Sequence, residues 1–235
     1  MREKVVHLRD KLEVVYSEKD WELLRGMRQE AIKLMKVLVD GEIPSTVHGS
    51  VARGDVSPTS DIDIFIPIEV SSFKVEVALR RADISYLTRR VELATPQHAI
   101  KAHIDVDIDR TITFPLVKLK RREWEFYRFG GVIDFNEIMS DKRVLGVDKR
   151  LILIEPTSEG HYESSIIGRE SSVAKLLNVS VDLVEERVRV LRRRDEVGRT
   201  GVYLKRELSP EESFEEVIKK ISERDPIIRR RLAAY

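Results

Sequence analysis

The segment Asp61-Ile62-Asp63-Ile64-Phe65-Ile66 constrains the fold most strongly, because acidic and apolar residues alternate along it. Side chains of a β-strand point alternately to opposite faces, so this period of two predicts a strand. Asp61 and Asp63 then share one face, and the apolar residues between them face the core. Two neighbouring carboxylates repel each other and lose solvation. A cation such as Mg²⁺ offsets that cost, so this strand is a candidate metal site.

The pair Gly49-Ser50 lies upstream, with ten residues between Ser50 and Asp61. Residues 45–48 before it are predicted to be a short strand. A glycine lets backbone approach a phosphate closely, and a helix start directs N–H groups towards an anion. The Ser50 hydroxyl adds a donor. Arg53 has two interpretations: it neutralises the charge of a bound triphosphate, or it forms a surface salt bridge with Asp55. Ser60, directly before Asp61, completes the candidate nucleotide-binding residues.

A third acid is expected to activate the attacking group or to complete a second metal site. Residues 102–108 are predicted to be a strand, and the run Asp105-Val106-Asp107-Ile108-Asp109 places three acids at one parity. We prefer Asp107 as the third carboxylate, with Asp105 close behind. Asp109 precedes Arg110 and lies near a turn. An exposed acidic strand face explains at least one of these residues equally well.

The remaining pattern of predicted strands and helices indicates an α+β (α/β) fold. Ser17 and Asp20 resemble a capping pair that begins a helix running to Val39. After residue 160 two short helices, a turn and a predicted hairpin have the order of a winged helix. We therefore expect a domain over residues 1–160 and a winged helix-turn-helix domain over 161–235. The other predicted elements are helices over 71–81, 171–177, 181–191 and 213–233, the last interrupted near Pro226, strands over 91–94 and 151–154, and the hairpin over 197–204.

Residues 47–66 resemble the signature of the DNA polymerase beta nucleotidyltransferase superfamily, and the ten-residue gap is similar to that of its minimal nucleotidyltransferase branch. The whole chain resembles predicted archaeal nucleotidyltransferases with a C-terminal helix-turn-helix. The resemblance implies a mixed β-sheet with flanking helices, two Mg²⁺ ions, an NTP donor and release of pyrophosphate. It places Gly49 and Ser50 at the triphosphate, Asp61 and Asp63 at the metal, and an acid at 105 or 107 as third carboxylate. Some relatives of this branch are antitoxins that attach AMP to a partner protein.

Composition limits the partners that the chain is expected to have. Its 42 Lys and Arg nearly balance 41 Asp and Glu, so a net charge of +1 gives no whole-chain case for nucleic acid or a membrane. There is no cysteine and no apolar run long enough to span a bilayer, which leads us to expect a cytoplasmic protein. Few amides and many charged residues are typical of thermophiles.

Residues 171–206 leave nucleic-acid binding open. Acidic residues begin the second helix of this segment and disfavour contact with phosphates, whereas Arg187, Arg189, Arg192–Arg194 and Arg199 favour it. An alternative function is a DNA-binding regulator or antitoxin-like protein with a nucleotide-sensing domain. The acceptor (protein, RNA or small molecule), the preferred NTP and the oligomeric state stay open. A basic and aromatic cluster over 118–129 is either an acceptor surface or an amphipathic helix.

Overall fold

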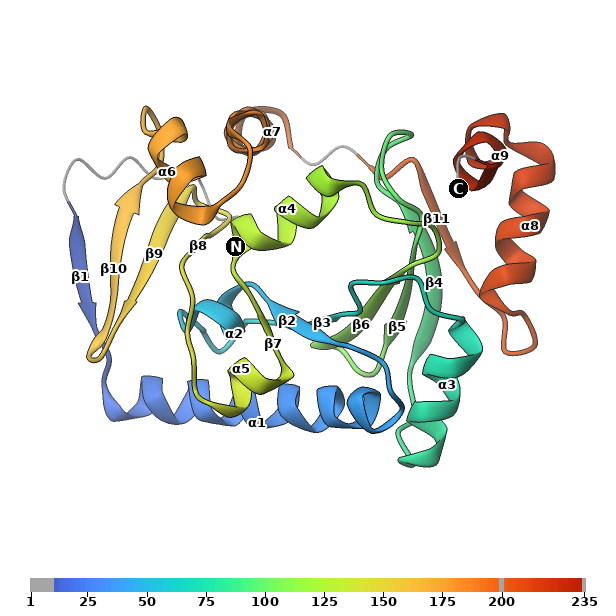
Figure 1. Cartoon of the computed structure of the whole chain (residues 1–235), viewed down its shortest axis with the longest axis horizontal. Coiled ribbons are helices and arrows are strands. Elements are labelled where there is room, and N and C mark those ends of the chain that lie inside the picture. Colours follow the sequence, from blue (N-terminus) through green and yellow to red (C-terminus); the bar gives the residue numbers. More distant parts are fainter. Residues whose placement is uncertain (1–10, 199–200, 234–235) are drawn as a thin grey trace. The chain divides into compact units, whose positions relative to one another are not determined.

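The computed structural model describes residues 11–198 and 201–233 (Figure 1). The chain divides into two compact units. The described part of unit 1 consists of residues 11–32, 47–60 and 124–198, and that of unit 2 of residues 33–46, 61–123 and 201–233. The division falls inside helix α1 (Glu18–Asp40) and strand β2 (Thr46–His48). Each unit is therefore built from separate stretches of sequence.

Unit 2 contains a mixed sheet in which β11, β4, β5, β6 and β3 follow one another (Figure 1). Strand β3 is parallel to β6, and the other neighbouring pairs are antiparallel. Half-buried and buried residues alternate along β4 and β5, which gives this sheet one apolar and one polar face. The strands are β3 (Ile62–Phe65), β4 (Thr88–Leu93), β5 (Lys101–Asp105), β6 (Arg110–Pro115) and β11 (Leu204–Glu207).

Helices cover the apolar face of this sheet. Phe214 at the start of α8 (Phe214–Arg224) packs edge-on against Phe114 of β6, with ring centroids 5.6 Å apart. Glu215 then accepts hydrogen bonds from the backbone N–H and hydroxyl of Ser72, the first residue of α3 (Ser72–Arg81). These contacts hold α3 and α8 together, while α9 (Pro226–Ala233) follows α8 after a break at Asp225. The polar face carries the acids described below.

Unit 1 is organised around a second, antiparallel sheet with the order β1-β10-β9-β8. Two helices, α6 and α7, pack on it through a shared apolar core that includes Leu153, Ile166, Val184 and Leu191. The sheet consists of β1 (Leu12–Val15), β8 (Gly146–Val147), β9 (Ile152–Thr157) and β10 (Gly160–Ser165), and the helices are α6 (Glu170–Leu177) and α7 (Val181–Val197).

The other elements of the described residues are α2 (Ser50–Arg53), α4 (Arg121–Gly130), β7 (Val132–Asp134) and α5 (Phe135–Met139). Helix α4 buries Tyr127 and Phe129, whereas Trp124 is half-buried and Phe126 is exposed. The amphipathic-helix reading of the 118–129 cluster therefore describes only part of its aromatic residues. Helix α1 begins as expected, because the Asp20 carboxylate accepts from the backbone N–H of Ser17 at 2.8 Å.

The predicted fold class, mixed sheet with flanking helices, is confirmed. The predicted hairpin over 197–204 is wrong: Val197 is the last residue of α7, and Leu204 begins β11, which pairs with β4. Residues 199–200 lie outside the described part. The expected boundary near residue 160 does not coincide with the two units, because β9 and β10 pair directly across it.

No helix within residues 11–198 and 201–233 has the length and hydropathy needed to cross a membrane.

Candidate active site

Asp63 lies in β3, as the alternating pattern predicts, and Asp61 directly precedes this strand. Ile62 and Ile64 are buried, whereas Asp61 is exposed and Asp63 is half-buried. The strand is anchored at this end because the Ile62 N–H donates to the carbonyl of Asp109 at 2.7 Å. Its two carboxylates are therefore held at the polar edge of the unit 2 sheet, with the core on their other side.

The expectation that Asp105, Asp107 and Asp109 share one strand face is wrong. Strand β5 ends at Asp105, and residues 106–109 form the turn that leads into β6. The N–H groups of Val106 and Asp107 both donate to the Arg110 carbonyl, which closes the turn. Asp105 is thus the last residue of a strand, whereas Asp107 and Asp109 project from a turn, where aspartate is favoured.

The Asp105 carboxylate is fixed on both of its oxygens. Thr111 donates to Oδ1 at 2.9 Å, and Thr88 donates to Oδ2 at 2.6 Å. The guanidinium of Arg90 forms an ion pair with the same Oδ2. Because these partners come from β4 and β6 on either side of β5, the orientation of Asp105 is set by the sheet itself.

The Asp107 carboxylate has a different environment. Its Oδ2 accepts from Arg110 at 2.5 Å, and its Oδ1 accepts from the backbone N–H of Asp109 at 3.0 Å. The hydrogen bond from Arg110 holds the pKa of the Asp107 carboxyl below its usual range. Asp107 is therefore a charged, partly exposed turn residue.

One depression of about 490 Å³ in unit 2 brings these acids together. Its size is that of ordinary small-molecule sites. In the described part of the chain, no three carboxylate or imidazole groups stand close enough together to hold a metal ion by themselves. The residues that line the depression are Asp61, Asp63, Leu87, Thr88, Arg90, Asp105, Asp107, Ile108, Asp109, Thr111 and Lys205.

Sequence reasoning missed four polar residues of this depression: Thr88, Arg90, Thr111 and Lys205. Strand β6 was not predicted, although Thr111-Ile112-Thr113-Phe114 alternates as a strand does. Lys205 belongs to β11, where it lies opposite Glu92 of β4. No short motif indicates Lys205, because only the long-range pairing of β11 with β4 places it here.

In unit 1, the Gly49–Gly54 turn has a glycine with positive φ at each end. Gly49 has φ 79° and Gly54 has φ 106°. A side chain on Gly49 would meet no atom within 4 Å, so there is open space beside its backbone. Its N–H, however, donates to the carbonyl of Gly131 at 2.9 Å. The expected Gly49 donor is thus engaged, and the remaining candidate donors of the turn belong to Ser50.

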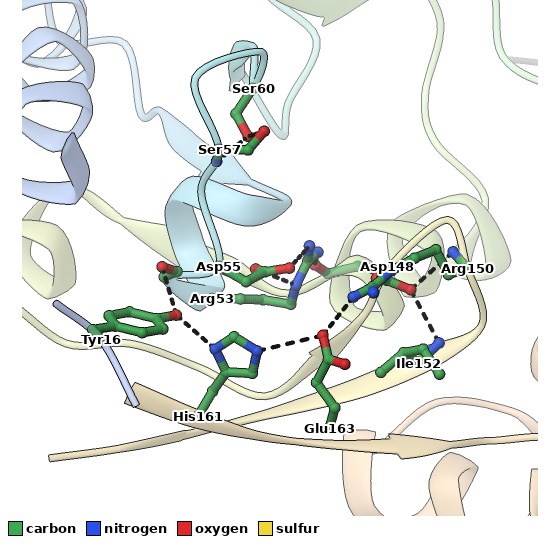
Figure 2. A network of polar contacts seen from close by, with 12 residues as sticks. Tyr16, Arg53, Asp55, Ser57, Ser60, Asp148, Arg150, Ile152, His161 and Glu163 are labelled. Carbon is green, nitrogen blue, oxygen red and sulfur yellow. Dashed lines mark hydrogen bonds and ion pairs between the residues drawn. The ribbon is translucent and has the colours of Figure 1, made fainter. Parts of the chain in front are cut away.

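Arg53 is directed into unit 1 (Figure 2). Its Nε and Nη2 donate to the two carboxylate oxygens of Asp55 at 2.9 and 2.8 Å, and Nη1 donates to the Gly130 carbonyl at 2.6 Å. The residue is only 5% exposed. Of the two readings of Arg53, the structure contains the ion pair with Asp55, and it is buried. A phosphate could reach this guanidinium only by displacing that pair.

Ser60 closes the loop that leads from this turn towards Asp61. The backbone N–H of Ser57 donates to the Ser60 hydroxyl at 2.9 Å, and the Ser60 N–H donates to the Ser57 carbonyl at 2.9 Å (Figure 2). These bonds make a compact Ser57–Ser60 turn. Gly49, Ser50, Arg53 and Ser60 belong to unit 1, whereas the acids belong to unit 2.

The arginines of α7 are not equivalent. Arg187 is packed over the ring of Phe126, 4.9 Å from its centroid, and burial lowers the pKa of its guanidinium to about 10. Its expected contact with phosphate is therefore not supported. Arg189, Arg192 and Arg193 are exposed, but Glu170, Glu185 and Glu196 line the same groove. Arg199 lies outside the described residues. This helix presents mixed charge, which does not mark a nucleic-acid surface.

Comparison with protein families gives one finding. The sequence model of the family described as "Nucleotidyltransferase domain" matches residues 29–228, a range that contains every candidate site residue named above. Comparison with curated proteins and with solved structures gave no match. Since the family match spans well over half of the 235 residues, the chain belongs to the nucleotidyltransferase domain family and is a transferase.

Proposed function

We propose that this chain transfers a nucleoside monophosphate from an NTP to an acceptor hydroxyl with the help of Mg²⁺ and releases pyrophosphate. The observation that carries the proposal is the acidic depression lined by Asp61, Asp63, Asp105 and Asp107. Membership of the nucleotidyltransferase domain family supplies the reaction class. The depression supplies the carboxylates that such a reaction needs.

Asp61 and Asp63 would hold the metal. Their oxygens are the donors that Mg²⁺ prefers, and Mg²⁺ is commonly bound by one or two carboxylates together with substrate phosphates rather than by a full protein cage. Arginines lie beside the two nearby acids, Arg90 beside Asp105 and Arg110 beside Asp107. The donor set therefore fits an ion that completes its shell with phosphate oxygens. When bound, Mg²⁺ neutralises charge that develops on the transferred phosphate.

We assign the third carboxylate to Asp105. Asp63 and Asp105 both lie opposite Thr111, so the three residues form one row across the polar face of the sheet. Threonines and Arg90 hold the Asp105 carboxylate in one orientation, as a positioned base or ligand requires. Asp107 was the preferred candidate from sequence, but it lies in the turn after β5 and outside this row.

Ser50 and the open backbone at Gly49 would contact the triphosphate. Glycine at this position leaves space for a phosphate beside the main chain, and the Ser50 hydroxyl is a donor at the start of α2. Arg53 would support this contact indirectly, because its pair with Asp55 and its bond to Gly130 set the shape of the turn. Catalysis would then consist mostly of positioning and charge neutralisation.

The position of a radioactive label tests this reaction. The protein with Mg²⁺ is incubated with α-³²P- or γ-³²P-labelled NTP and, separately, with the RNA, protein and small-molecule fractions of a cell extract. Transfer of α-label to one fraction, without γ-label and without transfer by Asp63→Asn, supports the proposal. Transfer of γ-label alone would show a phosphotransferase and contradict it.

A further inference from the structure

The turn between Gly49 and Gly54 is contacted by Tyr16, which directly follows β1 and is drawn in Figure 2, and by Arg143, which precedes β8. The Tyr16 hydroxyl, directly after β1, lies 2.9 Å from the Gly54 carbonyl oxygen and donates to it. Arg143 lies over Gly54 so closely that a side-chain carbon on this glycine would come within 2.6 Å of the Arg143 Cδ. Arg143 itself donates to the carbonyls of Gly160 and Thr157. The end of α2 is thus connected to the β9–β10 hairpin.

The Tyr16 hydroxyl also begins a chain of polar contacts inside unit 1 (Figure 2). It lies 2.7 Å from Nδ1 of His161, and Nε2 of His161 lies 3.5 Å from the Glu163 carboxylate. The second distance is that of an ion-pair contact rather than a short hydrogen bond. Arg150 then donates to Glu163 at 2.5 Å and to Asp148 at 2.6 Å. His161 is buried, so these contacts are shielded from solvent.

Counting protons fixes the roles in this chain. A tyrosine hydroxyl has one proton, and here that proton points to Gly54. Its oxygen must then accept from His161, so Nδ1 of His161 carries a hydrogen. The hydrogen bond from Tyr16 to Gly54 therefore goes with the tautomer in which Nδ1 of His161 carries the hydrogen.

The turn depends on such outside contacts for its shape. Helix α2 has four residues, and one helical turn is not stable by itself in water. Its last carbonyls are satisfied from elsewhere in unit 1, since the Ala52 carbonyl accepts from the Val144 N–H at 3.2 Å and the Gly54 carbonyl accepts from Tyr16. The direction in which Ser50 is presented is consequently set by tertiary contacts.

We propose that Tyr16 and His161 are positioning residues for nucleotide binding: they fix the Gly54 end of the turn and thereby the orientation of Ser50. This inference rests on the proposed function, because it assumes that Ser50 contacts the triphosphate. Tyr16 and His161 act through the turn and touch no substrate themselves. They are 145 residues apart in sequence and belong to no motif.

Nucleotide binding by Tyr16→Phe tests the proposal. The variant keeps the ring that packs on Trp21 at 4.9 Å and removes only the hydroxyl. The matched control is Tyr162→Phe. Tyr162 lies on the face of β10 opposite to His161, and Nζ of Lys11 lies 4.3 Å from the centroid of its ring. Titration calorimetry with ATP, GTP, CTP and UTP in Mg²⁺ should show a Kd about 3- to 10-fold higher in Tyr16→Phe, as expected for one lost hydrogen bond. Tyr162→Phe should bind like the wild type.

The outcomes separate the two proposals. If no NTP binds the wild type, the proposed function fails. If the wild type binds and Tyr16→Phe binds equally well, the inference fails while the proposed function stands. Urea unfolding of both variants controls for stability. If Tyr16→Phe and Tyr162→Phe lose the same free energy of unfolding, that loss cannot explain a Kd that changes only in Tyr16→Phe.

A double-variant comparison gives a readout that a merely structural role would not move. If His161 acts through the Tyr16 hydroxyl, His161→Ala should raise the NTP Kd in the wild-type background and change it by less than about twofold in the Tyr16→Phe background. Equal effects of His161→Ala in the two backgrounds would overturn the role of His161.

Discussion

Asp63 and Asp105 lie on the same face of one sheet with only Thr111 between them. Asp63 pairs with Thr111 in the parallel register of β3 and β6, and Asp105 pairs with the same residue in the antiparallel register of β5 and β6. Strands lie about 4.8 Å apart, so the two backbones are separated by about 10 Å. Long-range pairing, not sequence proximity, therefore creates this acidic row.

Replacing the acids one at a time distinguishes the two candidates for the third carboxylate. Asp105→Asn should lower nucleotidyl transfer by about 100-fold or more, the usual effect of losing a general base. Asp107→Asn and the turn control Asp109→Asn should change it by less than about tenfold, because both residues lie in the turn, outside the row of Asp63, Thr111 and Asp105. Transfer rates with the acceptor fraction identified by labelling give the measurement. A larger loss in Asp107→Asn than in Asp105→Asn would reverse the assignment.

Gly49→Ala should destabilise the protein even though there is space for the methyl group. The φ of 79° is in the left-handed region that favours glycine, and a strained residue there costs about 1 to 3 kcal/mol. Gly26→Ala is the matched control, since Gly26 lies inside α1 with no atom within 4 Å of the added carbon. It should stabilise by about 0.5–1 kcal/mol. Urea unfolding of both variants decides this, and equal midpoints would contradict it.

Arg53→Ala should unfold readily, because it leaves Asp55 without its partner inside the protein. Breaking a buried ion pair from one side costs about 3–5 kcal/mol. Arg25→Ala breaks the exposed pair of Arg25 with Glu18 and should cost less than about 1 kcal/mol. The free energies of unfolding in urea provide the comparison. If Arg53→Ala kept wild-type stability and lost only NTP affinity, Arg53 would be a phosphate ligand after all.

Glu163 should make the free energy of unfolding depend on pH in the acidic range. Its contacts with His161 and Arg150 lower the pKa of the Glu163 carboxyl to about 2, whereas an unfolded glutamate titrates near about 4.3. Stability from this carboxylate is therefore complete above about pH 4.3 and is lost as pH falls towards about 2. Because the group is partly exposed, we expect about 1 kcal/mol.

Glu163→Gln should accordingly show a shallower loss of stability between about pH 4.3 and 2 than the wild type does. Glu155→Gln is the control. Glu155 lies on the adjacent strand, pairs with Lys11 and is more exposed than Glu163. Urea unfolding at several pH values gives the slopes. Parallel slopes for wild type and Glu163→Gln would show that the polar chain does not stabilise the fold.

Local pattern predicted the elements whose periodicity is strong. The alternation of acids and isoleucines located β3, and the helical spacing located α1, α3, α6 and α8. It failed where two local interpretations compete. The run from Asp105 to Asp109 has strand parity, but aspartates also favour turns, and here the hairpin between β5 and β6 decides.

Pairing over long sequence distances could not be predicted at all. The segment after α7 was expected to form its own hairpin, yet β11 pairs with β4, more than a hundred residues earlier. The polar chain from Tyr16 to His161 is of the same kind, because neither residue has a local signal that identifies the other. Such contacts depend on which strands become neighbours, and no periodicity within one segment encodes that.

The binding of Mg²⁺ and NTP at Asp61 and Asp63 is the central claim, and calorimetry tests it most directly. Each of the four NTPs is titrated with and without Mg²⁺ into the wild type and the Asp61→Asn/Asp63→Asn double variant, after matching urea unfolding curves have shown that both are folded. We predict binding that requires Mg²⁺ in the wild type and is weakened at least about 100-fold in the variant. NTP binding of equal strength in both proteins, or binding that does not depend on Mg²⁺, would contradict the account.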